Sequence, residues 1–374
     1  MVGDRSPPTR AGTIAPATFA LVGAGWRGQY FLRIARALSS RFRVSGVVVR
    51  DPARAEEISA AWHVRTHPCQ AALLDTAQRP DFLVLAVDRA SAPALLAEAA
   101  AADLPVLTET PPAADLAGLR EVWELVAAGA RVQVAEQYLF HPWHAARLAV
   151  ARSGRLGRIT HAQVSIAHGY HGVSLLRCLL GAGFEPARIT AREFAAPLVA
   201  GPDRQGPPRE ERVVEAPQVI AQLDYGDRLG VHDFTTGQYR SWIRAPRLLA
   251  RGERGEVRDA EVSYLKDFHT PVTLALRRMD SGRSGGPEGG GHLGILAGEE
   301  WVYENPFPGV DLSDDEIAGA TSLLRMAEHV RAGGPGPYPF AEAAQDQYLA
   351  LCIEQACASG DAVTTERQPW AEAA

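Results

Sequence analysis

The sequence predicts an α/β protein whose N-terminal part is a doubly wound parallel sheet and whose C-terminal part is an α+β domain with a mostly antiparallel open sheet. Three observations lead to this prediction. Apolar strand patterns alternate with helical patterns from Thr18 to Tyr138, and a glycine-rich turn follows the first strand. From about Arg188 onward, a series of short strand patterns precedes two helices at the end of the chain.

The N-terminal pattern is a regular alternation of strands and helices. Parallel strands require crossover connections, so this order predicts a parallel sheet with helices on both faces. The predicted strands cover residues 19–25, 43–50, 80–87, 104–110 and 131–138. The predicted helices cover residues 26–40, 52–62, 91–102 and 113–129.

The C-terminal pattern changes after Tyr138. Helical spacing is expected over 141–154 and 173–181, with a strand over 158–168 between them. Further strands are expected over 217–226, 228–234, 271–278 and 291–298, and the final helices over 312–333 and 340–360. The Gly/Pro-rich stretches 201–211 and 279–292 are expected to be mobile surface loops.

The length of 374 residues favours two domains, because a single core rarely extends over so long a chain. We expect a flexible tail over residues 1–17, an N-terminal domain over 18–138 and a C-terminal domain over 139–374. The tail lacks the apolar core of a signal peptide.

Composition and charge exclude several function classes. The net charge is −6 and no basic block occurs, which argues against nucleic acid as a partner. No apolar run approaches the length of a membrane span, so we expect no membrane association. Four cysteines, Cys69, Cys178, Cys352 and Cys357, show no metal-ligand spacing and lie in apolar stretches. We interpret them as reduced core thiols of a cytoplasmic protein.

The first predicted strand ends in GAGWRG, where Gly23, Gly25 and Gly28 fit the pattern G-x-G-x-x-G. This turn follows a strand and opens a helix, which is the context in which the pattern indicates a Rossmann dinucleotide-binding domain. The first glycine permits the tight turn, the second lets a pyrophosphate approach the backbone, and the third lets helix and strand pack closely. The helix N-terminus would bind the phosphates. The intervening Trp26 and Arg27 are included in the predicted cofactor site.

The end of the second strand bears on the choice between NAD and NADP. An acidic residue at this position binds the ribose 2′-hydroxyl of NAD, whereas an arginine accommodates the 2′-phosphate of NADP. Arg50 occupies the strand end and Asp51 follows it. Arg50 at the strand end favours NADP. If the strand instead ends one residue later, Asp51 takes this position and favours NAD. We therefore expect NADP or NAD as the cofactor.

At the level of motifs, the chain resembles the Gfo/Idh/MocA (glucose–fructose oxidoreductase / inositol dehydrogenase) family over nearly its whole length. The motifs are GAGWRG, ETP, SGRLGRI, HGYHGVSLLRCLLG, VYENPFPG, LSDDEIA and AEAAQDQYLALCIEQA. The resemblance implies hydride transfer between a nicotinamide and a sugar, polyol or sugar derivative. It also implies a C-terminal domain that binds substrate and serves oligomerisation, so we expect a homodimer or homotetramer.

The chain departs from the family at two positions that usually take part in catalysis. The family's lysine lies in an E-K-P turn, which here reads Glu109, Thr110, Pro111, and the only lysine of the chain is Lys266. The family's G-x-H-x-x-D pattern keeps its histidine as His171, while Ser174 replaces the aspartate. Glu109 is counted among the cofactor-binding residues, with a role as a simple turn residue as the alternative.

Because the family's lysine and aspartate are replaced, we assign proton transfer to other residues of this chain. Oxidation of an alcohol needs a base, and a histidine with a pKa of about 6.5 suits that role. His171 is the first candidate, with His168 and Tyr170 beside it and Tyr138 at the end of a strand. His168 and His171 would share one face if a helix begins at Gly169, and would point apart if the strand continues. The two histidines lack a third ligand, so no metal is expected.

Three functions are compatible with these residues. The first is an NAD(P)-dependent oxidoreductase acting on a CH–OH group. The second is a redox-neutral NAD-dependent glycosidase, which oxidises, eliminates, hydrates and re-reduces its sugar, since such enzymes resemble this family and also lack the E-K-P lysine. The third is a non-catalytic dinucleotide-binding sensor.

Overall fold

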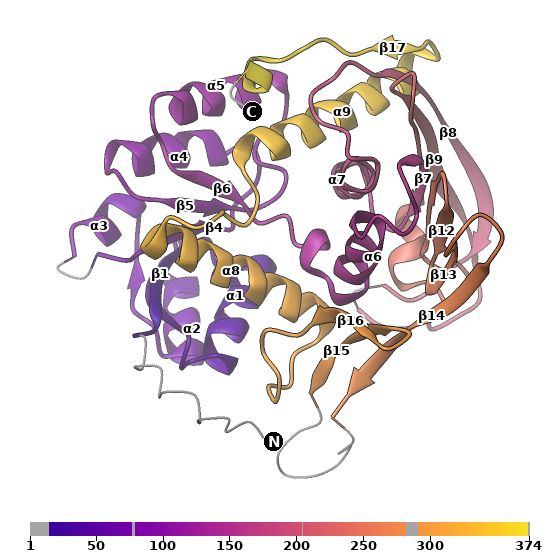
Figure 1. The fold of residues 1–374 in the computed structure, drawn as a ribbon. Coiled ribbons are helices and arrows are strands. Elements are labelled where there is room, and N and C mark those ends of the chain that lie inside the picture. Colours follow the sequence, from indigo (N-terminus) through magenta and orange to yellow (C-terminus); the bar gives the residue numbers. More distant parts are fainter. Residues whose placement is uncertain (1–14, 77–78, 204, 282–290, 373–374) are drawn as a thin grey trace, which may run out of the picture.

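The computed structural model describes residues 15–76, 79–203, 205–281 and 291–372 (Figure 1). Most of the expected tail, and residues 282–290 of the second expected loop, lie outside the described residues. Within the described part, the expected tail ends earlier than residue 17, because Ala17 already belongs to the first strand and is buried.

The N-terminal part is a six-stranded parallel sheet with the strand order β3-β2-β1-β4-β5-β6. This order confirms the predicted doubly wound Rossmann sheet. Its strands are β1 (Ala17–Val22), β2 (Phe42–Val48), β3 (Thr66–His67), β4 (Phe82–Leu85), β5 (Val106–Thr108) and β6 (Val132–Val134). Its helices are α1 (Trp26–Ala37), α2 (Pro52–Trp62), α3 (Gln70–Leu74), α4 (Ala92–Ala101) and α5 (Leu116–Ala127).

Local sequence explains where these helices begin. The Asp51 side chain accepts a hydrogen bond from the backbone N–H of Arg54 and caps α2, and Pro52 occupies the first helical position. In α5, Asp115 caps the helix by accepting from the N–H of Gly118. The helix predicted from residue 113 therefore starts at Leu116.

In the C-terminal part, the described residues form an eleven-stranded sheet, and among its pairings only that of β7 with β10 is parallel. It confirms the predicted, mostly antiparallel sheet. The strands are β7 (Ile159–Ser165), β8 (Arg188–Val199), β9 (Val213–Asp224), β10 (Leu229–Thr235), β11 (Arg247–Gly252), β12 (Gly255–Arg258), β13 (Glu261–Leu265), β14 (Pro271–Asp280), β15 (His292–Ala297), β16 (Glu300–Glu304) and β17 (Val363–Thr364). The long strand β8 was not predicted, because most of its side chains are exposed and show no apolar alternation.

Helices cover one face of the large sheet. They are α6 (Pro142–Arg152), α7 (Gly169–Leu180) and α9 (Phe340–Ser359), and Figure 1 shows them between the two sheets. The opposite face of the large sheet carries no helix in this view. Large apolar side chains remain exposed on and beside this sheet, among them Val213, Ile220, Trp242 and Phe268.

One C-terminal helix belongs to the N-terminal layer. Helix α8 (Asp314–Ala332) packs on α1, and Ile317, Leu323 and Met326 join the same buried cluster as Phe19 and Phe31. The segment after α8 then pairs with β6, where the N–H of Val134 donates to the carbonyl of Tyr338. The division of the chain at residue 138 stays a prediction, since residues from the end of the chain complete the N-terminal core.

Candidate functional site

The glycine-rich turn has the geometry of a phosphate cradle. Gly23 has a φ of +98°, which a glycine adopts without strain. A Cβ at Gly28 would lie 2.1 Å from the carbonyl oxygen of Gly23, so this glycine allows α1 to pack against the turn. Gly25 caps α1 without a side-chain hydrogen bond, and a Cβ there would meet no protein atom within 4 Å. The free space at the helix N-terminus thus lies beside Gly25, where an anion can reach the backbone N–H groups.

A cavity of about 670 Å³ opens from this turn along the carboxyl edge of the N-terminal sheet. Gly23 and Gly25 line it, together with Arg50 and Asp51 after β2. Arg50 is exposed, and no hydrogen bond or ion pair is found for its guanidinium among the described residues. Asp51 is engaged as the cap of α2. The residues present therefore fit a dinucleotide. The guanidinium of Arg50, unpaired among the described residues, lies where the ribose would be expected.

Arg27 and Glu109 lie outside the lining of this cavity. Arg27 Nε lies 2.8 Å from Glu109 Oε1, and its guanidinium stacks over the ring of Tyr30 at 4.2 Å. This pair joins the first turn of α1 to the turn after β5. Trp26 is more than half exposed. The cofactor-binding roles of these three residues stay predictions.

The proton-handling candidate His171 is joined to a buried carboxylate. Its Nδ1 lies 2.7 Å from Oε2 of Glu136, whose side chain is fully buried. The other carboxylate oxygen of Glu136 accepts the backbone N–H of Tyr138 at 2.9 Å. On the opposite side of the ring, Nε2 of His171 lies 3.4 Å from the hydroxyl oxygen of Thr110. Thr110 stands in the turn after β5, at the same sheet edge as the dinucleotide cavity.

Tyr138 does not lie on a strand, which corrects the prediction. Strand β6 ends at Val134, and Tyr138 begins a short 3₁₀ helix (Tyr138–Phe140) because the Glu136 carboxylate holds its N–H in a turn. Its ring still packs on His171, with centroids 4.4 Å apart. Burial raises the pKa of the Tyr138 hydroxyl, so it remains protonated.

The open question about His168 and His171 is answered by the start of α7 at Gly169. His168 is the residue before the helix, and the two rings lie on the same side, 5.0 Å apart. Desolvation and then the neighbouring His171 ring lower the pKa of His168 to about 4. Tyr170 is buried, and its hydroxyl has no hydrogen-bond partner in the described part of the chain. The catalytic role of Tyr170 stays a prediction.

A smaller cavity of about 280 Å³ adjoins these groups. Pro111, His168 and Tyr170 line one side of it, and His232 and Phe234 of β10 line another. Arg89, Glu193 and Glu354 also contribute to its wall. The cavity therefore combines apolar surface with a few polar and charged groups, as small-molecule sites do.

Two features of the site could not be assigned from the sequence. The sequence does not indicate that Glu136 and Thr110 contact His171. Their proximity to His171 depends on tertiary structure, since 35 and 61 positions separate them from it. The one available signal is Glu136 itself, a carboxylate within the predicted strand 131–138.

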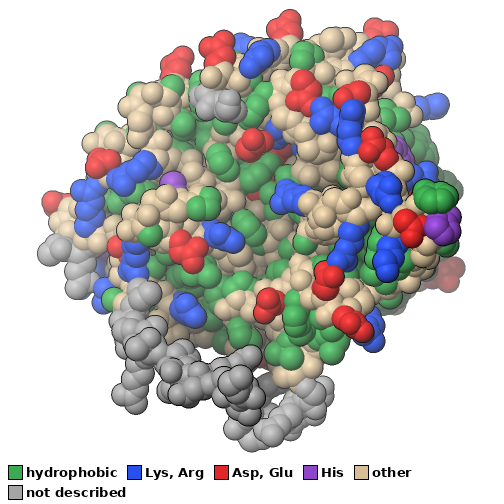
Figure 2. All heavy atoms as spheres, in the orientation of Figure 1, with side chains coloured by type: hydrophobic (Ala, Val, Ile, Leu, Met, Phe, Trp, Pro, Cys, Tyr) green, Lys and Arg blue, Asp and Glu red, His purple; other side chains and the backbone are tan. Residues whose placement is uncertain are grey.

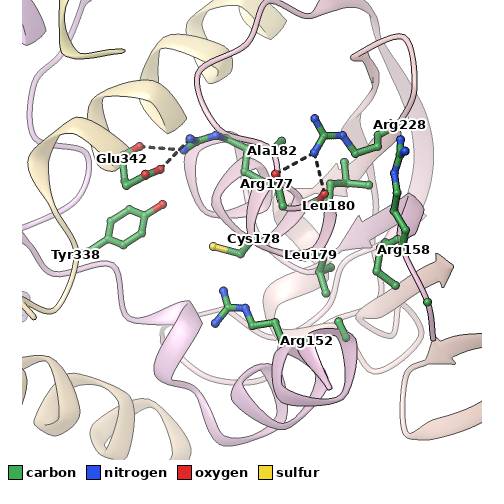
Figure 3. A pocket seen from close by; sticks show the side chains of 14 residues that line it. Arg152, Arg158, Arg177, Cys178, Leu179, Leu180, Ala182, Arg228, Tyr338 and Glu342 are labelled. Atoms are coloured by element: carbon green, nitrogen blue, oxygen red, sulfur yellow. Dashed lines mark hydrogen bonds and ion pairs between the residues drawn. The ribbon is translucent and has the colours of Figure 1, made fainter. Parts of the chain in front are cut away.

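A third cavity, of about 540 Å³, lies between α6, α7 and α9 and is lined by four arginines (Figure 3). Arg177 is paired with Glu342 and Asp346, Arg228 with Glu185, and Arg158 with Asp227. Figure 3 shows Arg177 directed to Glu342 and Arg228 directed to backbone carbonyls of α7. The ion pairs of Arg177 hold α7 against α9, and the other two pairs join neighbouring loops, so we interpret the cavity as part of the packing.

The four cysteines differ in how far they are buried. Cys352 is buried and Cys178 and Cys357 are half-buried, but Cys69 is exposed, so the expectation of core thiols is wrong for Cys69. No group of three potential metal ligands is found among the described residues. None of the described helices is both long and apolar enough to cross a bilayer. Figure 2 shows acidic and basic side chains interspersed on the visible face.

Comparison with known proteins identifies the N-terminal domain. Residues 17–136 match the model of the GFO_IDH_MocA family, described as an oxidoreductase family with an NAD-binding Rossmann fold. The N-terminal domain belongs to the Gfo/Idh/MocA oxidoreductase family. The resemblance expected from the sequence motifs is thereby confirmed, as is a nicotinamide dinucleotide as cofactor. A search of curated protein sequences finds no match.

Solved structures share the fold of both parts of the chain. An oxidoreductase from Agrobacterium radiobacter, solved with NAD⁺, L-tartaric acid and magnesium, is 16% identical, with a TM-score of 0.67 over 93% of this chain and 98% of that chain. A putative myo-inositol dehydrogenase from Sinorhizobium meliloti is 17% identical, with a TM-score of 0.65 over 94% and 100%. The WlbA dehydrogenase from Bordetella pertussis, solved with NADH and UDP-GlcNAcA, is 17% identical, with a TM-score of 0.63 over 94% and 100%.

Proposed function

We propose that the protein is an NAD(P)-dependent oxidoreductase that transfers a hydride between the nicotinamide and a CH–OH carbon of a sugar, polyol or sugar derivative. The observation that carries the proposal is the His171–Glu136 pair, with Nδ1 and Oε2 2.7 Å apart, at the sheet edge that also carries the glycine-rich turn. Oxidising an alcohol requires a hydride acceptor and a proton acceptor; the dinucleotide held at the glycine-rich turn would be the first, and His171 would be the second.

The dinucleotide, when bound, supplies the hydride acceptor or donor. His171 takes up the proton that the alcohol releases. Glu136 is acceptor-only when ionised, so it fixes the proton of the neutral His171 ring on Nδ1 and leaves Nε2 free to accept. The same carboxylate stabilises the imidazolium that forms when Nε2 is protonated.

The substrate would occupy the cavity of about 280 Å³ beside Pro111 and His168. Its mixture of apolar surface with Arg89, Glu193 and Glu354 suits a small polyhydroxylated molecule, whose C–H faces are apolar and whose hydroxyls need hydrogen-bond partners. The WlbA dehydrogenase and the putative myo-inositol dehydrogenase of the same fold are named for, or solved with, molecules of this type.

The two alternatives make different demands on this site. A sensor has no need of a base, and the buried Glu136 that orients His171 weighs against it. A redox-neutral glycosidase needs the same hydride and proton acceptors as a dehydrogenase, and the Glu109–Thr110–Pro111 turn is compatible with it. Product analysis separates these functions, because only the net oxidoreductase changes the redox state of the cofactor.

The test is turnover across a panel of polyols, sugars and nucleotide sugars, with NAD⁺ and NADP⁺ in turn. We expect net formation of reduced nicotinamide with at least one substrate. Release of sugar from a glycoside without net reduction would favour the glycosidase. Cofactor binding without either reaction across the panel would favour the sensor.

We also propose that the protein acts as a cytoplasmic homo-oligomer, a dimer or tetramer, assembled through the large sheet. Val213, Ile220, Trp242 and Phe268 expose large apolar side chains on and beside this sheet, and we propose that association covers them. Light scattering after size exclusion tests this. A monomer at micromolar concentration would contradict it, and Ile220→Asp is expected to dissociate the oligomer.

A further inference from the structure

We propose that the hydroxyl of Thr110 is the group that touches the substrate hydroxyl and passes its proton to His171, so that Thr110, His171 and Glu136 form a proton relay. This inference rests on the proposed oxidoreductase function. The geometry behind it is a continuous line of hydrogen-bonding atoms, from Glu136 Oε2 to His171 Nδ1 at 2.7 Å and from His171 Nε2 to Thr110 Oγ1 at 3.4 Å.

The direction of these hydrogen bonds follows from chemistry. The Glu136 carboxylate can only accept, so Nδ1 of His171 carries the ring proton and donates it. Nε2 then has a free lone pair and accepts the hydroxyl hydrogen of Thr110. The Thr110 oxygen keeps two lone pairs, and no hydrogen-bond donor to it besides the His171 ring is found among the described residues. The hydroxyl is therefore prepared to accept a proton from a substrate while giving its own to the imidazole.

Other candidates near His171 are less able to do this. The Arg27 guanidinium is bound to Glu109, and arginine remains protonated. Tyr170 is buried, and the raised pKa of Tyr138 disfavours loss of its phenolic proton. Thr110 is half-buried, and its neighbour Pro111 lines the small cavity. Thr110 thus contacts His171 and directly precedes Pro111, a residue that lines the cavity proposed to hold the substrate.

The relay balances protons and electrons. In the oxidation direction, the substrate O–H proton moves to Thr110 Oγ1, and the Thr110 proton moves to His171 Nε2. The hydride leaves the same substrate carbon for the oxidised dinucleotide, and the carbonyl double bond forms. The products are a carbonyl compound, the reduced dinucleotide and one proton held on the His171 imidazolium beside Glu136. Reduction follows the reverse path.

The variants Thr110→Val, Thr110→Ser and His171→Asn test the relay. Valine keeps the branched shape and removes the hydroxyl, whereas serine keeps the hydroxyl. We expect T110V to lower kcat about 100-fold, the lower end of the range for general acid–base groups, with dinucleotide affinity unchanged. T110S should remain within about threefold of wild type, a difference of less than about 0.7 kcal/mol in barrier height.

A second readout needs neither substrate nor cofactor. In nitrogen NMR spectra, Nε2 of His171 should carry the signature of a hydrogen-bond acceptor in the wild type and in T110S. In T110V its resonance should move toward that of a free imidazole nitrogen. Serine thus separates loss of the hydroxyl from a change in packing.

The outcomes distinguish failure of the relay from failure of the proposed function. Loss of activity in H171N with full activity in T110V would overturn the relay and leave the proposed function intact. Equal impairment of T110S and T110V would also overturn it, because packing rather than the hydroxyl would then matter. Full activity in both H171N and T110V would contradict the proposed function itself.

Discussion

His171 and Glu136 form a hydrogen bond of 2.7 Å between Nδ1 and Oε2, and the carboxylate is fully buried. A buried carboxylate is costly unless its oxygens are satisfied, and here the second oxygen accepts the N–H of Tyr138. The pair therefore determines both the orientation of the imidazole and the conformation of the chain after β6. Any role of His171 in proton transfer depends on this contact.

Replacing Glu136 by Gln should impair catalysis more than cofactor binding. The glutamine amide can donate to Nδ1, which would place the ring proton on Nε2 and remove the proton acceptor. We expect kcat to fall about 100-fold or more, by analogy with loss of the orienting carboxylate in other histidine-dependent enzymes. Steady-state kinetics and dinucleotide titration measure the two effects. Glu121→Gln, on the exposed side of α5, is the control and should be neutral. Equal activity of E136Q and E121Q would refute the orienting role.

Replacing Gly25 or Gly28 of the turn by alanine should have different effects. At Gly25 a methyl group would contact no protein atom but would occupy the space beside the helix N-terminus. We expect G25A to keep nearly wild-type thermal stability while weakening dinucleotide binding about tenfold or more, which corresponds to about 1.4 kcal/mol. At Gly28 the methyl would collide with the carbonyl of Gly23, so G28A should lower stability by about 1–3 kcal/mol. Calorimetry of both variants, with and without NADH, gives the comparison. Unchanged cofactor affinity in G25A would place the pyrophosphate elsewhere.

Arg50 should determine preference for the 2′-phosphate. Its guanidinium lines the dinucleotide cavity and has no partner among the residues that the structure describes. A hydrogen bond to a charged group contributes about 1.5–3 kcal/mol, so Arg50→Ala should weaken NADPH binding about tenfold or more and leave NADH binding nearly unchanged. Arg43→Ala, at the exposed opposite end of β2, is the matched control. If the wild type binds NADH as tightly as NADPH, or more tightly, Arg50 does not provide a preference for the 2′-phosphate.

His232 should make the fold sensitive to acid. Burial lowers its pKa to about 4, from an ordinary value of 6.5. Between these values the unfolded chain binds more protons than the folded chain, so stability falls as the pH decreases through this window. We expect His232 to account for a loss of about 2 kcal/mol in the free energy of unfolding at about pH 5, relative to about pH 7.5. Urea unfolding of wild type and His232→Asn at both pH values measures it. A pH dependence of equal steepness in the two proteins would show that His232 is not responsible.

Much of the N-terminal domain could be predicted because local patterns determine it. Helix α2 was predicted at Pro52–Trp62, where a capping aspartate and a proline mark its start. Strand β6 was predicted too long, because Glu136 diverts the chain through a side-chain to backbone hydrogen bond that no periodicity reveals. In the C-terminal domain, β8 was missed since both of its faces are largely exposed and its partner β9 stabilises it through the backbone.

The candidate site was predicted in part. His171 and the glycines follow from motifs with local geometry, and the structure brings His168 and Tyr138 to the same place. Glu136 and the hydrogen bond to Thr110 were not foreseen, because contacts across 35 and 61 positions arise from packing of the two domains' elements. The sequence motifs indicate the sheet edge at which the candidate site lies, but not the residues that contact its histidine.

The most direct test of the oxidoreductase assignment is reduction of the nicotinamide by the wild-type protein and by His171→Asn with the same polyol or sugar substrate. The assignment predicts net reduction by the wild type and a loss of about 100-fold or more in kcat for H171N, with unchanged dinucleotide affinity. Activity of H171N within a few-fold of the wild type would contradict the account.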